Sequence, residues 1–155
     1  MIDIRRLLLV GICLCLMISL CACNARQVYS PDEIHKEVSF ESGGITITGM
    51  LDYTKGEEMS FTVREPENIS GTVFTDDEIS LGEVKIGYGK MKNNSPVHTL
   101  FMILSDLLTK EAEIPFKGEY AYESAASSAE YKIIFDCENR EIKSIETGKI
   151  TYNFE

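Results

Sequence analysis

Apolar and polar residues alternate over most of the chain from Lys36 onward, and this period of two restricts the fold more than any other feature. Tyr131, Ile133 and Phe135, for example, share one face of an extended run. Such a period places alternate side chains on opposite faces of a β-strand, one buried and one facing water. Turn-forming residues separate the runs at short intervals, which is typical of an antiparallel meander. We expect about eight strands between residues 36 and 154.

One segment follows a helical period instead. The sequence predicts an amphipathic helix over about residues 96–111 because its apolar residues recur at steps of three and four. Ser95 is a suitable N-cap, and Pro96 suits the first helical position. The apolar stripe is wider than a helix on a protein surface needs. Its main members are Val97, Leu100, Phe101, Leu104, Leu107 and Leu108.

These elements predict an α+β, mainly β fold: a curved antiparallel meander sheet, or half-barrel, with the helix packed on its concave face. One helix of about 10 Å diameter cannot cover so wide a flat sheet. The sheet must curl around the helix or leave an apolar hollow, which would bind an apolar molecule. The alternative is an ordinary, filled core. The residues expected to line a hollow are Ile47, Leu51, Phe61, Val63, Ile86, Phe101, Leu104, Ile133 and Phe135.

The first 22 residues have the pattern of a secretory signal peptide. Arg5 and Arg6 precede an uncharged apolar run at residues 7–20. A positive start followed by a short apolar run is typical of such signals. The run is shorter than the roughly 20 residues that a transmembrane helix needs. A permanent anchor helix is the less favoured alternative.

Residues 20–23, Leu-Cys-Ala-Cys, resemble the lipobox of bacterial lipoproteins. Leu20 and Ala22 fit the positions three and one before a modified cysteine, and Cys21 occupies the loosely specified position between them. The resemblance implies that Cys23 carries a thioether-linked diacylglycerol and is the first residue of the mature chain. Modification at Cys21 fits worse because bulky Leu20 would then directly precede the modified residue.

The cysteines fit a metal site or a disulfide framework poorly. A structural zinc site typically uses two close pairs separated by a folded loop, whereas Cys13, Cys15, Cys21 and Cys23 all lie in or at the end of the apolar run. After cleavage Cys137 is the one unmodified thiol, so no framework remains. Its mostly acidic neighbours disfavour a reactive thiolate. We therefore expect Cys137 to be a small core or edge residue.

Length and charge indicate one acidic domain. Removing residues 1–22 from the 155-residue chain leaves 133 residues, enough for a single domain with its own core. We expect a lipidated N-terminus and tether over residues 23–35 and the domain over residues 36–155. The mature chain has 13 Lys and Arg against 24 Asp and Glu, a net charge of −11. Nucleic acid and anionic lipid head groups repel such a surface. The acyl chains, and not a basic surface, should therefore hold the protein at the membrane.

Catalytic motifs are absent from the sequence. It contains no phosphate-binding glycine loop, no HExxH and no GxSxG, which are the patterns of common catalytic sites. His35 is isolated, and His98 in the first helical turn is expected to be a surface or boundary residue. Acidic pairs such as Asp76–Asp77 fall in turns and should be solvated. We therefore expect no enzyme activity, no cofactor and no metal.

The lipobox, the hairpin strands, the single helix after mid-chain and the closing run YKIIFDCENREIKSIETGKITYNF (residues 131–154) resemble small bacterial lipoproteins of the LolA/LolB/LppX-like superfamily. The resemblance implies a half-barrel anchored at the extracytoplasmic face of the cell membrane, in a Gram-positive bacterium of clostridial type. Known members include carriers of lipoproteins or lipids. Clostridial relatives include spore-germination lipoproteins that partner a peptidoglycan amidase.

Two functions therefore stay open at this point. In the first, the half-barrel binds an apolar ligand or lipid. In the second, the chain is a non-catalytic interaction module that recruits or activates a cell-envelope enzyme.

Replacing Cys23 with Ala should leave the chain unlipidated and its signal segment uncleaved, because the resemblance makes the Cys23 thiol the acceptor of the lipid. Labelling with a radioactive fatty acid and the electrophoretic mobility of the chain measure the two steps. The Cys21→Ala variant is the matched control and should be labelled normally. A fatty acid that still marks the Cys23→Ala chain would refute the site.

Overall fold

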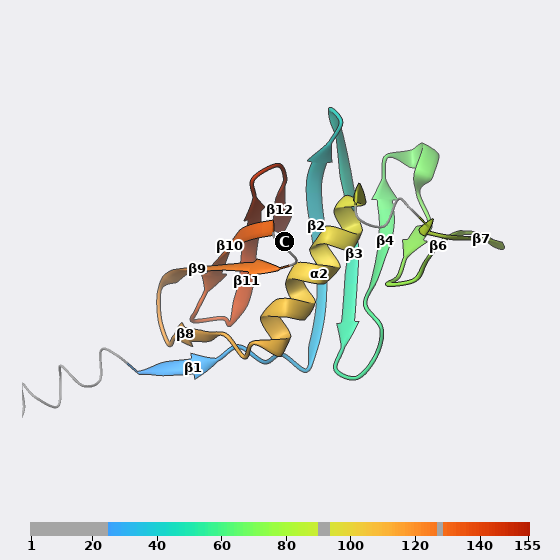
Figure 1. The fold of residues 1–155 in the computed structure, drawn as a ribbon. Coiled ribbons are helices and arrows are strands. Elements are labelled where there is room, and N and C mark those ends of the chain that lie inside the picture. Colours follow the sequence, from blue (N-terminus) through green and yellow to red (C-terminus); the bar gives the residue numbers. More distant parts are fainter. Residues whose placement is uncertain (1–24, 90–93, 127–128) are drawn as a thin grey trace, which may run out of the picture.

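A computed structural model describes residues 25–89, 94–126 and 129–155. Within these ranges the chain forms twelve β-strands and one α-helix (Figure 1). The helix is α2 (Pro96–Thr109). The strands are β1 (Arg26–Val28), β2 (Glu33–Ser42), β3 (Ile45–Thr54), β4 (Ser60–Glu65), β5 (Thr72–Phe74), β6 (Glu78–Leu81), β7 (Val84–Gly87), β8 (Glu113–Pro115), β9 (Glu119–Ala126), β10 (Ala129–Asp136), β11 (Glu141–Thr147) and β12 (Thr151–Phe154).

Ten of the strands form one antiparallel sheet in the order β7-β6-β5-β4-β3-β2-β12-β11-β10-β9, and β1 pairs with β8 in a separate two-stranded sheet. The large sheet is two meanders joined by the pairing of β2 with β12. Figure 1 shows α2 crossing one face of this curved sheet on the way from edge strand β7 to edge strand β9. The sheet is not closed into a barrel. The predicted fold class, mainly β with one helix across a curved antiparallel sheet, is confirmed.

The strand number exceeds the expected eight for two local reasons. Gly82, with φ of +59°, forms a turn within a stretch that was expected to be one strand, and this turn separates β6 from β7. The residues at 148–149 similarly separate β11 from β12. The other two additional strands, β1 and β8, are three residues each. A three-residue strand is too short to show a period of two, so the alternation did not predict it.

The N-terminal segment is attached to the domain rather than extended as a tether. β1 pairs with β8, and the backbone N–H of Tyr29 donates to the carbonyl of Ala112 at 2.8 Å. The Tyr29 side chain is 3% exposed, and its ring centroid lies 4.9 Å from that of Phe135. Within the expected tether over residues 23–35, the segment from Arg26 to Tyr29 therefore packs against the domain. Burial of the Tyr29 ring fixes this otherwise polar segment to the sheet, and the sequence pattern alone did not indicate it.

The core is a single hydrophobic cluster with contributions from α2, from both meanders and from the β1–β8 pair. The helix begins as its sequence predicts, because the Ser95 hydroxyl accepts from the backbone N–H of His98 and Pro96 occupies the first turn. It ends at Thr109, two residues before the expected end. The largest fully buried side chains are Tyr152, Phe40, Phe61, Phe101, Phe135, Leu51, Leu100, Ile103, Leu104, Leu107, Ile114 and Ile133.

The last strand, β12, lies in the interior of the sheet between β2 and β11. Its Tyr152 is 0% exposed, and the Tyr152 hydroxyl donates to the carbonyl of Pro96 at 2.8 Å. The Tyr152 ring also lies 5.3 Å from that of Phe40, centroid to centroid. One side chain thus connects the strand that joins the two meanders to the start of α2.

Deleting residues 151–155 should therefore unfold the domain, because β2 and β11 would lose the strand between them. Far-UV circular dichroism would measure the loss of sheet. The milder Tyr152→Phe variant keeps the ring but leaves the Pro96 carbonyl without its donor, so the free energy of unfolding should fall by about 1–2 kcal/mol. A truncated chain that keeps a cooperative urea transition would contradict this role for β12.

Replacing Gly49 with Ala should destabilise the domain by about 1–3 kcal/mol, the usual cost of overpacking a core. A Cβ at Gly49 would lie 2.5 Å from the Phe61 Cζ atom and 2.5 Å from the Thr62 carbonyl oxygen. Gly87→Ala is the matched control, since a Cβ there meets nothing within 4 Å. Urea unfolding of both variants measures the difference. Equal midpoints would show that β3 and β4 adjust freely.

Candidate functional site

The nine residues expected to line an apolar hollow fall into three groups. Seven are at most 1% exposed and belong to the core cluster; they are Leu51, Phe61, Val63, Phe101, Leu104, Ile133 and Phe135. Ile47 is partly buried against the same cluster. Ile86, on β7, is 60% exposed. The structure thus brings eight of the nine together as packed side chains and places Ile86 on the surface.

Three surface hollows are open and lined largely by polar residues. One of about 670 Å³ lies over β9, β10 and β11, where Lys132 Nζ is 3.4 Å from Glu146 Oε2. One of about 490 Å³ lies over β2, β3 and β4 and includes the ion pair of Arg64 with Glu37. A third of about 350 Å³ lies beside α2. Of the nine expected lining residues, Phe101 alone borders any of these three.

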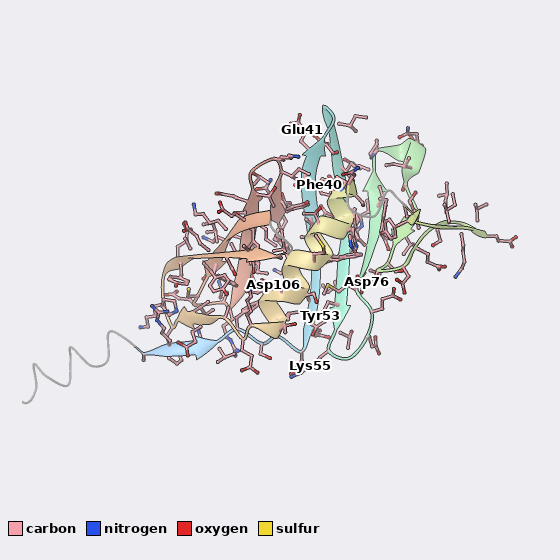
Figure 2. The ribbon with its side chains drawn as sticks, in the orientation of Figure 1. Phe40, Glu41, Tyr53, Lys55, Asp76 and Asp106 are labelled. Carbon is pink, nitrogen blue, oxygen red and sulfur yellow. The ribbon has the colours of Figure 1, made fainter. Side chains whose placement is uncertain are left out.

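A polar cluster fixes the C-terminal half of α2 to the second meander. Asp106, labelled in Figure 2, accepts a 2.6 Å hydrogen bond from the Tyr131 hydroxyl and lies 2.7 Å from Lys110 Nζ. Lys110 also donates to the Ser124 hydroxyl at 2.8 Å. Burial opposes ionisation of Asp106, but the hydrogen bonds from Lys110 and Tyr131 outweigh it and lower the pKa of the carboxyl. The cluster positions the helix.

The β6–β7 hairpin carries an exposed apolar surface that sequence reasoning identified only in part. The register pairs Ile79 with Ile86 and Leu81 with Val84, so these four side chains share one face of the hairpin. We call these four residues the β6–β7 strip. Leu81 is 50%, Val84 61% and Ile86 60% exposed. The two-residue turn at Gly82 and Glu83 is the sequence signal that places Leu81 opposite Val84.

Aromatic rings connect the base of this hairpin to the core. The Phe74 ring lies 6.5 Å from Phe61 on one side and 6.5 Å from Tyr88 on the other, centroid to centroid. The Tyr88 hydroxyl donates to the Thr75 carbonyl at 2.9 Å, and burial, followed by the nearby carboxylates of Asp76 and Glu58, raises the pKa of Tyr88 to about 12. The hairpin base is therefore well packed and lies in a negative field.

The other residues considered from the sequence lie apart from one another. Cys137 is 0% exposed, and burial, with a smaller effect of Asp136, raises the pKa of its thiol. This confirms it as a core residue. His98 is partly buried, with its ring 5.8 Å from that of Tyr88. His35 pairs with Asp52 on the exposed surface.

The predicted lipid attachment site, Cys23, and the other lipobox residues Leu20, Cys21 and Ala22 lie outside the described residues. In the part of the chain that the structure describes, no helix combines the length and apolarity needed to span a bilayer. Across the same ranges, no three His, Cys, Asp or Glu side chains gather in a way that would hold a metal ion.

Comparisons with protein-family models, with curated proteins and with solved structures find no significant match. The resemblance to the LolA/LolB/LppX-like superfamily therefore stays a prediction from the sequence, and the function must be inferred from the residues themselves.

Replacing Asp106 with Asn should lower the free energy of unfolding by about 1 kcal/mol at pH 7, because a charged hydrogen-bond acceptor is lost. A lowered folded-state pKa stabilises the fold above the unfolded value of about 3.9 and loses that effect as pH falls through the folded pKa. The difference between the parent chain and the variant should therefore shrink below about pH 4. Urea unfolding at pH 7 and pH 3 measures it, with Glu123→Gln as the control. A difference that does not change with pH would contradict the ionic role of Asp106.

Proposed function

We propose that this chain is a membrane-anchored, extracytoplasmic lipoprotein that acts as a non-catalytic interaction module for a protein of the cell envelope, such as an envelope enzyme that it recruits or activates. The observation that carries the proposal is the filled interior. Seven of the nine residues expected to face a ligand are instead at most 1% exposed and belong to one packed cluster.

A carrier of acyl chains would need a different interior. A site for an apolar molecule is a concave cavity with largely apolar walls, and its lining side chains would be exposed to that cavity. Here the wall of the 670 Å³ hollow carries Glu123, Lys132 and Glu146, and the wall of the 490 Å³ hollow carries Glu37 and Arg64. An acyl chain in either hollow would lie against charged groups. This chemistry favours a protein partner over a stored lipid.

The anchor supports the same function by raising local concentration. A diacylglycerol on Cys23 would supply two acyl chains, and two chains hold a protein stably at a bilayer where one does not. Confinement near the membrane converts binding of an envelope partner into a nearly intramolecular event, which strengthens weak contacts without new ones.

Chemical crosslinking in the cells that encode the chain tests the proposal. The full chain and its Cys23→Ala variant are purified after crosslinking, and the captured proteins are quantified by mass spectrometry. We expect one or a few extracytoplasmic proteins to be enriched with the parent chain and at least tenfold less with the unanchored variant. Solvent extraction of the same samples should release no lipid in stoichiometric amount beyond the anchor.

Two results would count against the proposal. One is the absence of any protein enriched over the Cys23→Ala control. The other is an extractable lipid that accompanies the domain at one molecule per chain, which would favour the carrier function.

A further inference from the structure

The core-facing side of the sheet continues past the helix, and at the β6–β7 hairpin no element of the described residues covers it. Successive strand pairs place Leu51 opposite Phe61, Phe61 opposite Phe74, Phe74 opposite Ile79, and Ile79 opposite Ile86. Directly opposed residues in antiparallel strands project from the same face. Exposure rises along this row, from 0% at Leu51 and Phe61 through partial burial at Phe74 and Ile79 to 60% at Ile86.

The hairpin is amphipathic. One face holds the β6–β7 strip, while the register places Glu78, Ser80 and Lys85 on the other, with Lys85 Nζ 2.7 Å from Glu78 Oε1. The six large apolar side chains that stand out as exposed in the described part of the chain include three from this strip, Leu81, Val84 and Ile86. Isolated exposed apolar residues are common, but a clustered apolar face usually marks an interaction surface.

The width of the strip fits one α-helix. Two neighbouring strands span about 10 Å from edge to edge at a spacing of about 4.8 Å, and a helix with its side chains is about 10 Å across. The same sheet face is already covered by a helix, α2, farther along (Figure 1). A second helix laid beside it would extend the same two-layer packing over Ile79, Leu81, Val84 and Ile86.

The charges around the strip select the partner. Around the strip, Glu83 lies in the turn between Leu81 and Val84, and Asp76 and Asp77 precede β6. Lys85, the cation of this hairpin, is paired with Glu78 on the opposite face. The whole chain has a net charge of −10. Complementary charge speeds encounter and suppresses wrong partners. A helix that docks here should therefore carry Lys or Arg beside its apolar stripe.

We infer that the β6–β7 strip is the docking surface for an amphipathic helix of a partner protein, with an aliphatic stripe flanked by Lys and Arg. The inference rests on the proposed function and gives it a surface and a partner chemistry. The hairpin is pre-organised for docking by the Phe61, Phe74 and Tyr88 rings at its base. Such order lowers the entropy lost on binding.

Two other occupants fit the same surface less well. A lipid surface with anionic head groups repels the carboxylates around the strip, and Figure 1 places β1, the described strand nearest Cys23, at the opposite end of the molecule from β7. A second copy of the chain would bring two acidic hairpins together.

Site-specific photocrosslinking in the native cells tests the inference with the full chain. p-Benzoylphenylalanine replaces Ile86 in one variant and Ile45 in the matched control, because Ile45 is also an exposed aliphatic residue (55%) but lies at the start of β3. We expect the Ile86 probe to capture a protein segment with aliphatic residues at helical spacing and an excess of Lys and Arg. Mass spectrometry of the crosslinked peptide reads the segment directly.

Substitutions provide an independent readout. Replacing Val84 and Ile86 together with Ser should reduce recovery of the chemically crosslinked partner at least about tenfold, because the partner helix would lose its contacts with two aliphatic side chains. Ile45→Ser should leave recovery unchanged. Glu83→Lys should also reduce it, whereas Glu123→Lys on the far edge strand β9 should not. Circular dichroism verifies that each variant is folded.

Several outcomes would overturn the inference. They are capture by Ile86 of a phospholipid, of a second copy, of a segment without excess positive charge, or of nothing above the Ile45 control. If one of these outcomes occurs while general crosslinking of the full chain still enriches proteins, the docking surface is wrong and the proposed function stands. If no protein is enriched by either method, both fail.

Discussion

The structure depends on a mismatch of width between one helix and a ten-stranded sheet. Ten strands at a spacing of about 4.8 Å span more than 40 Å, whereas α2 is about 10 Å across. The sheet face that α2 crosses carries apolar side chains on the central strands β2 and β12 and outward from them toward both edges of the sheet. Every part of that face that the helix does not reach must be buried in another way or remain exposed.

The two sides of the sheet meet this constraint differently. On the side of the second meander, the small β1–β8 sheet adds cover, since Ile114 is 0% exposed and Tyr29 packs on Phe135. Polar contacts of Asp106 with Tyr131 and of Lys110 with Ser124 fix the helix there as well. On the side of the first meander, the aromatic rings of Phe74 and Tyr88 complete the packed layer. Beyond them, the described part of the chain leaves the apolar face exposed at Leu81, Val84 and Ile86 of the β6–β7 strip.

Local features could be predicted from the sequence because the information they need is local. The start of α2 follows from Ser95 and Pro96, and alternation identified the long strands. The pairing of β2 with β12 joins residues more than a hundred positions apart, so no window of sequence contains it. The hydrogen bond of Asp106 with Tyr131 depends on where the helix crosses the sheet. Lipidation at Cys23 stays a prediction because that residue lies outside the described ranges.

Ile86 shows most clearly what periodicity leaves open. Its position in the alternation correctly places it on the same face as Phe61 and Phe74. Alternation determines which side of the sheet a residue occupies, but it does not determine whether another element lies over that side. The expectation that Ile86 lines an apolar hollow assumed that other elements enclose every residue on the core-facing side. At 60% exposure Ile86 is not covered within the described chain.

The position of the anchor gives this uncovered surface a functional orientation. If Cys23 is lipidated, two residues separate it from Arg26 in β1, and the three residue-to-residue steps reach about 10 Å when fully extended. Because β1 is paired with β8 and Tyr29 is buried, this anchor would hold the end of the domain that carries β1 close to the bilayer. The β6–β7 hairpin lies at the other end (Figure 1). An apolar surface on a membrane-facing end would be satisfied by lipid, whereas one directed away from the bilayer meets water unless a protein covers it.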